Sequence, residues 1–127
     1  MMNYRIYLPG AIDRPPSAPE LSAATILADY FKRDVHFEAR HGSLKTADFR
    51  IGGALWELKS PLGRGKRTIQ NNIRKANQQC ANIVVDLRFC KINEEQAIQR
   101  VRYEVLRMTS IKKVLVITKD IRVLAIK

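Results

Sequence analysis

The segment from Asp48 to Lys59 holds the side chains best spaced for chemistry. It reads Asp48-Phe-Arg-Ile-Gly-Gly-Ala-Leu-Trp-Glu57-Leu-Lys59, with Gly52-Gly53 at its centre. Two successive glycines suit the positive φ angles of a two-residue hairpin turn, so we expect two antiparallel strands. A turn of that length places Asp48 directly opposite Glu57.

Alternation of side chains along a strand assigns the residues of this hairpin to two faces. The core face is expected to hold Phe49, Ile51, Ala54, Trp56 and Leu58, and the opposite face Asp48, Arg50, Glu57 and Lys59. Directly opposed Cβ atoms lie about 4.5–5.5 Å apart, and like charges at that distance are destabilising. The paired carboxylates therefore call for a cation.

A divalent metal ion could supply that positive charge, because carboxylate oxygens are the ligands that Mg²⁺ and Mn²⁺ prefer. Glu20 is a possible third carboxylate ligand, although its position slightly favours an exposed acid in the first turn of a helix. Lys59 could then stabilise negative charge on an attacked phosphate. The alternative is that Arg50 and Lys59 neutralise the two acids on a solvated face of the sheet.

A basic stretch follows the hairpin. Between Lys59 and Val85 the sequence contains no acid. Glycines at 63 and 65 would let backbone amides approach a ligand, and Thr68 could cap a helix whose N-terminus favours phosphate. The candidate substrate-binding residues are Arg64, Lys66, Arg67, Thr68, Arg74, Lys75 and Gln78. Weaker candidates, as acids or bases in a metal-free reaction, are His36, Glu38 and His41.

The elements that must position these residues follow from hydrophobic periodicity. Residues 1–18 are expected to form an extended, proline-rich lead-in, and helices are expected from Pro19 to Phe31, from Thr68 to Cys80 and from about Asn93 to Met108. Strands are expected at 35–39, 47–51, 54–60, 83–85, 114–117 and 123–126. The order α-β-β-β-α-β-α-β-β predicts an α/β (α+β) fold, a sheet covered by helices, in a single domain spanning 1–127.

Composition and charge limit the classes of binding partner that this chain is expected to have. The chain has 127 residues, 46% hydrophobic and 28% charged, with a formal net charge of +11. Such an excess favours a polyanion such as nucleic acid, through neutralisation of phosphates. No apolar run reaches the length of a membrane span or a signal peptide, so we expect cytoplasmic synthesis and no membrane partner. Cys80 and Cys90 are expected to be buried free thiols.

The spacing Asp48-x8-Glu57-x-Lys59 within this element order resembles the PD-(D/E)XK nuclease superfamily, with Ala47 in place of the proline. A longer stretch resembles the C-terminal tRNase domains of contact-dependent-inhibition toxins. It runs through Thr46–Pro61, Arg67–Gln79 and Asn82–Arg88, and includes the closing Val-Leu-Val-Ile-Thr-Lys-Asp120. This resemblance implies a toxin nuclease that cleaves RNA, with tRNA favoured, and a cognate immunity protein, expected to be acidic.

Two other interpretations remain open. Some toxin tRNases have a barnase/EndoU/colicin/RelE-like fold and cut without metal. In this chain such a mechanism would recruit His41, Lys59 and Thr68, with Asp48 and Glu57 in supporting roles. The third interpretation is a non-catalytic nucleic-acid-binding module, which would bind in a salt-dependent manner and release no product.

Overall fold

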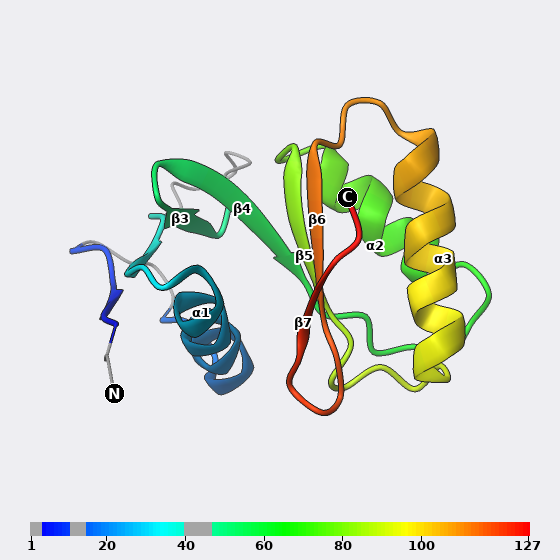
Figure 1. Ribbon diagram of the computed structural model, residues 1–127, viewed down its shortest axis with the longest axis horizontal. Coiled ribbons are helices and arrows are strands. Elements are labelled where there is room, and N and C mark those ends of the chain that lie inside the picture. The colour runs from blue at the N-terminus through cyan, green and yellow to red at the C-terminus, as the bar shows by residue number, and fades with distance from the viewer. Residues whose placement is uncertain (1–3, 11–14, 40–46) are drawn as a thin grey trace.

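The fold is built around one mixed β-sheet with helices on both faces (Figure 1). The structure is a computed structural model that describes residues 4–10, 15–39 and 47–127. Within these residues the strands form a seven-stranded sheet in the order β1-β2-β3-β4-β5-β6-β7. The expected mixed α/β class is therefore confirmed, and the described residues contain no helix long and apolar enough to cross a membrane.

The elements match the expected order with one addition. A short strand, β1, lies in the segment predicted to be only an extended lead-in, and it pairs parallel with β2. That prediction was therefore incomplete, because two residues give too short a pattern to recognise. The elements are β1 (Ile6–Tyr7), α1 (Ala18–Phe31), β2 (Val35–Phe37), β3 (Phe49–Ile51), β4 (Ala54–Lys59), α2 (Thr68–Asn77), β5 (Asn82–Asp86), α3 (Glu94–Arg107), β6 (Lys113–Ile117) and β7 (Val123–Ala125).

Local sequence signals set the ends of the helices. Ser17 and Glu20 form a capping box at the start of α1, in which the Glu20 carboxylate accepts a hydrogen bond from the Ser17 backbone N–H at 2.9 Å. Asn93 caps α3 by accepting a hydrogen bond from Gln96 N–H at 3.2 Å, as its spacing predicted. By contrast, α2 has Arg67 at its N-cap and no side-chain cap, so the expected capping role of Thr68 is wrong.

The sheet divides the apolar side chains between two cores. The face toward α1 packs Leu27 with Phe49 and Trp56 of the hairpin, and Trp56 is 3% exposed. The face toward α2 and α3 packs Ile73 and Val101 against β5 and β6. Figure 1 shows this division, with α1 on one side of the sheet and α2 and α3 on the other.

Strand β4 joins the two halves of the sheet. Its first residues, from Ala54 to Trp56, pair antiparallel with β3, while its last residues, from Glu57 to Lys59, pair parallel with β5. Glu57 is in register with Ile83, whose side chain belongs to the core beneath α2 and α3. The candidate acid therefore lies where the strand changes partner, on the face toward α2.

Candidate active site

The hairpin turn has the predicted length. Gly52 and Gly53 both adopt positive φ, 58° and 83°, and the register pairs Ile51 with Ala54 and Phe49 with Trp56. The core face is confirmed as well, because Phe49, Ile51, Trp56 and Leu58 are buried on the side toward α1. Glycine takes both turn angles without strain, because it has no Cβ.

The ladder nevertheless ends one residue before the acid. Phe49 is in register with Trp56, yet the Asp48 backbone N–H also donates to the Trp56 carbonyl, at 3.0 Å. Two residues thus oppose one, as in a β-bulge, which re-aims the side chain of the extra residue. The expected direct pairing of Asp48 with Glu57 is therefore not part of the ladder.

Asp48 instead bends toward the backbone beyond Glu57. One oxygen of its carboxylate accepts a hydrogen bond from the Leu58 backbone N–H at 2.8 Å, and the residue is only 7% exposed. The alternative, in which Arg50 and Lys59 neutralise the acids on a solvated face, does not hold, since Glu57 is also buried, at 3% exposed. The bulge and the face under α2 together enclose both carboxyl groups.

The carboxyl groups of Asp48 and Glu57 remain neighbours. The pKa of Glu57 is raised from 4.5 to about 8. Burial is the largest cause, followed by the charge of Asp48 and a hydrogen bond with the Asp48 carboxyl group. A hydrogen bond between two carboxyl groups requires that one of them be protonated. The pair therefore holds a proton near neutral pH in the absence of another cation.

Lys59 is the one predicted cation that joins the acids. Its ammonium group lies 3.3 Å from Glu57 Oε2 and its side chain is 23% exposed. Arg50 does not neutralise the pair, because its guanidinium binds Glu38 at 2.8 Å on the exposed side of the hairpin. Within the described residues, Glu57 Oε1 is buried and has no hydrogen-bond partner.

The donors around Glu57 meet the needs of a divalent metal ion in part. A buried carboxylate oxygen without a partner, beside a second carboxylate, is a donor set that a hard divalent ion accepts. In the described part of the chain, however, no group of three or more His, Cys, Asp or Glu side chains is gathered to hold an ion. Glu20 serves in the cap of α1 and so does not complete such a group.

The basic residues predicted to bind substrate, called here the basic arm, are exposed from Arg64 to Lys75. Arg64, Lys66 and Arg67 lie in the loop before α2, and Arg74 and Lys75 on the outer face of the helix. Gln78 is exposed at the C-terminal end of α2. A Cβ on Gly63 would come 2.9 Å from the Thr68 hydroxyl. The space left by the missing side chain is therefore occupied by the Thr68 side chain.

The remaining sequence candidates lie apart from the acids or outside the described residues. His36 is exposed and stacks on Tyr7, with ring centroids 4.5 Å apart. Glu38 is paired with Arg50, and His41 lies outside the described residues. Both cysteines are free thiols as expected, but Cys80 is only partly buried. Burial, and to a smaller extent the charge of Glu57, raises the pKa of Cys80, which places this thiol near the acids.

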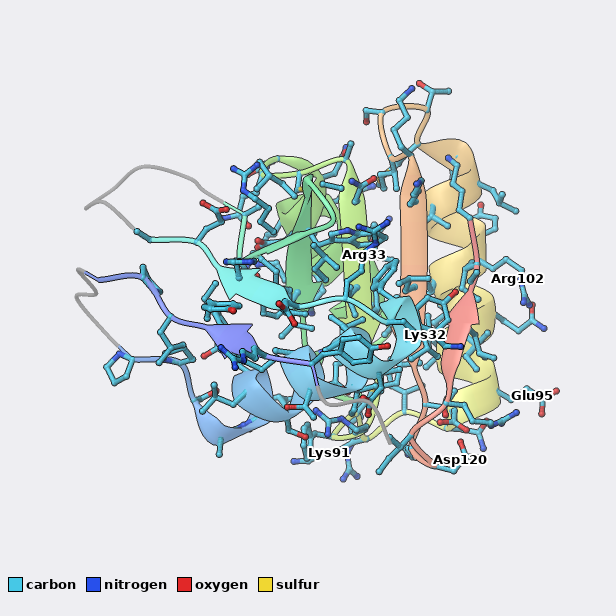
Figure 2. All side chains as sticks on the ribbon, turned by 60° about the vertical axis from the view of Figure 1, so that its left-hand side comes forward. Lys32, Arg33, Lys91, Glu95, Arg102 and Asp120 are labelled. Carbon is cyan, nitrogen blue, oxygen red and sulfur yellow. The ribbon has the colours of Figure 1, made fainter. Side chains whose placement is uncertain are left out.

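Sequence reasoning missed three features around this site. Gln79, rather than Gln78, has a buried amide oxygen without a partner among the described residues. Its position three residues after the buried Ala76 could have indicated that it faces inward. Glu104 is buried within the apolar stripe of α3. Beside the hairpin turn, Lys32 and Arg33 at the end of α1 line a hollow of about 480 Å³ together with Arg50; Figure 2 labels the first two.

The fold and the buried acids describe a small mixed α/β domain with a basic surface, and comparison with known proteins gives its family. Residues 45–123 match the model of the contact-dependent growth inhibition CdiA C-terminal domain. This chain belongs to that family. The resemblance to C-terminal domains of contact-dependent-inhibition toxins is thereby confirmed.

A solved structure has the same fold. It is described as a CdiA-CT/CdiI toxin and immunity complex from Burkholderia pseudomallei, with a TM-score of 0.62 and 19% sequence identity. The alignment covers 97% of this chain and 98% of that chain. No curated protein matches the sequence.

Proposed function

We propose that this chain is a toxin-type endonuclease that cleaves the phosphodiester bonds of RNA, with tRNA as the favoured substrate. The observation that carries the proposal is the buried cluster of Asp48, Glu57 and Lys59, in which two carboxyl groups are neighbours and the Lys59 ammonium lies 3.3 Å from Glu57 Oε2. Family membership and the net charge of +11 support it.

Asp48 and Glu57 would hold a divalent ion such as Mg²⁺ or Mn²⁺. Such an ion, when bound, supplies Lewis-acid polarisation of the phosphate and a bound water of lowered pKa. Glu57 must lose its proton to act as a ligand, and its raised pKa makes this step favourable only as the pH approaches about 8. The unpartnered Oε1 of Glu57 is the oxygen that is free to accept the ion.

Lys59 would stabilise the charge that develops on the attacked phosphate. Its ammonium group is held by Glu57 Oε2 at 3.3 Å and retains solvent access. A preorganised donor of this kind contributes about 10²–10³ in rate. The loop and helix face that carry Arg64, Lys66, Arg67, Arg74 and Lys75 would grip the backbone of the substrate through its phosphates.

Cleavage of tRNA by the purified chain tests the proposal, with Mg²⁺ or Mn²⁺ and with EDTA. The Lys59→Ala and Glu57→Gln variants are expected to lose cleavage by about 10²–10³. Lys91→Ala, which removes an exposed lysine elsewhere, should leave the rate unchanged.

Each alternative predicts a different outcome. Cleavage that survives EDTA would overturn the metal-dependent mechanism and favour the metal-free one. Undiminished cleavage by Lys59→Ala would overturn the site. Salt-dependent binding of tRNA without any product would overturn the nuclease and leave the non-catalytic module.

We also propose a cognate immunity protein of acidic character as a partner, and action on RNA in the cytoplasm. The solved relative is described as a complex of toxin and immunity protein. A chain with 23 lysines and arginines against 12 acids favours an acidic partner.

A further inference from the structure

A second polar hollow lies between α2 and α3. It has a volume of about 490 Å³ and is lined by Lys66, Gln70, Gln99, Arg100, Tyr103 and Glu104. That volume falls within the range of small-ligand sites, about 300–1,000 Å³. None of these side chains belongs to the acid cluster on β4.

Glu104 is the unusual member of this lining. It is 8% exposed and lies in α3 between the buried residues Val101 and Val105. Within the described residues it accepts no hydrogen bond and forms no ion pair, although Arg100 and Lys66 line the same hollow. No oxygen of Glu104 is among the fully buried, unpartnered atoms of the described residues, so its carboxylate opens into the hollow, where a ligand can reach it.

The other lining groups are of complementary kinds. The carboxamides of Gln70 and Gln99 have no hydrogen-bond partner among the described residues, and each offers both a donor and an acceptor. Arg100 is held against the loop by a 3.5 Å hydrogen bond to the Lys66 carbonyl. The ring of Tyr103 is held by Arg107, whose guanidinium carbon lies 4.8 Å from its centroid.

A nucleotide matches this combination. Lysine and arginine neutralise a phosphate, a tyrosine ring stacks on a base, and carboxylate and carboxamide groups bind base edges. A carboxylate presents two acceptors side by side, and guanine alone among the common bases offers two adjacent donors, N1–H and the N2 amino group. Adenine and cytosine place a ring acceptor beside their amino group, where it would repel the second oxygen.

We propose that this hollow is a guanine site that receives one unpaired guanine of an RNA substrate, with Glu104 accepting from N1–H and the N2 amino group. Gln70 and Gln99 bind the remaining edge, and Lys66 and Arg100 bind the phosphate. The inference deepens the proposed nuclease function and rests on it for its biological meaning, but the binding itself does not depend on cleavage.

Binding of mononucleotides to the whole chain tests the site directly, by calorimetry. Guanosine monophosphate is expected to bind about tenfold or more tightly than adenosine monophosphate or inosine monophosphate, since inosine lacks only the N2 amino group. Glu104→Gln should abolish this preference.

Glu95→Gln is the matched control, because it makes the same change in the same helix. Glu95 is exposed, and Figure 2 shows its side chain extending from α3 into solvent. Nine residues separate it from Glu104, about 13 Å along the helix. The control should keep the preference for guanosine, and equal behaviour of the two variants would overturn the role of Glu104.

A second arm separates free nucleotide from RNA. A single-stranded pentanucleotide with one central guanine should bind the Lys59→Ala variant more tightly than the same strand with adenine. Binding of guanosine monophosphate without this difference would overturn the RNA assignment. Equal binding of guanosine and inosine monophosphates to the unaltered chain would overturn the guanine site whether or not Glu104→Gln folds.

Failure here is distinguishable from failure of the nuclease. Cleavage of RNA without any preference for guanine in binding would overturn the guanine site and leave the nuclease proposal intact. A preference for guanine in binding, with no cleavage under any metal condition, would overturn the nuclease proposal and support the guanine site.

Discussion

Two buried acids on neighbouring strands have opposite surroundings. Asp86, at the end of β5, is 0% exposed, and Arg88 contacts both of its oxygens, at 3.0 Å and 2.8 Å. Arg88 also donates to the Ser22 hydroxyl of α1 at 2.6 Å. Glu57 on β4 faces another acid, and one of its oxygens has no partner within the described residues.

The difference separates an acid that holds the fold together from one that is available for chemistry. A buried charge that is fully paired and hydrogen-bonded recovers much of its desolvation cost. Asp86 and Arg88 meet this condition and tie β5 to the first turns of α1. Glu57 does not meet it, so the fold bears a cost there that binding of a cation would remove.

The largest effect is expected at the paired acid. Arg88→Ala should lower the free energy of unfolding by about 3–5 kcal/mol, because it leaves Asp86 buried and unpaired. Urea unfolding followed by circular dichroism measures the change.

The chain supplies a matched control for that substitution. Asp120 and Arg122 have the same spacing and the same 2.8 Å contact, but their side chains are 61% and 64% exposed. Figure 2 shows Asp120 at the surface. Arg122→Ala should cost far less than Arg88→Ala, because solvent screens the exposed pair, and similar costs for the two variants would contradict the contrast between buried and exposed pairs.

A smaller effect is expected from the pH dependence of Glu57. Its folded pKa, about 8, is above the ordinary 4.5, so the folded state keeps a proton that the unfolded state releases. The stability contributed by this proton is complete below about pH 4.5 and is lost as the pH rises through 8. Between pH 6 and pH 8 the loss should be about 2 kcal/mol.

Glu57→Gln should remove this slope, because glutamine does not titrate. Unfolding free energies of both proteins at pH 6, 7 and 8 provide the measurement. Added Mn²⁺ should restore stability to the unaltered chain at pH 8 and have no effect on the variant. Parallel pH profiles for the two proteins would show that Glu57 is not the titrating group.

The smallest effect is expected for single residues of the basic arm, because each exposed charge neutralises only one phosphate. Arg74→Ala should weaken tRNA binding modestly and reduce the salt dependence of binding by about one counterion. Lys91→Ala, outside the arm, is the control with the same loss of charge. Titrations at several salt concentrations measure the slope, and equal slopes for the two variants would remove the arm from the binding surface.

The sequence was sufficient wherever a pattern was local. The Gly52-Gly53 turn determined the hairpin register, and the stripes of α2 and α3 identified the residues that pack against the sheet. Asn93 identified the start of α3. These signals depend on backbone angles and helical spacing, which neighbouring residues determine.

Features that depend on tertiary contacts were not predictable. The two-residue turn predicted a ladder that reaches Asp48, but the bulge opposite Trp56 ends it at Phe49. The burial of Glu57 follows from α2 covering that face, which the hairpin does not encode. Glu104 was missed because a charged residue beside an apolar stripe usually reaches solvent, and here α2 covers it.

The change of partner along β4 has a consequence for folding. Glu57 and Lys59 belong to the part of the strand that pairs with β5, whereas Asp48 enters through the hairpin with β3. All three side chains belong to the hairpin, but the burial of Glu57 requires β5 and α2, which come later in the chain, to dock against β4. An isolated hairpin or a partly synthesised chain would leave the Glu57 carboxyl group hydrated, so its raised pKa would arise only once folding is finished.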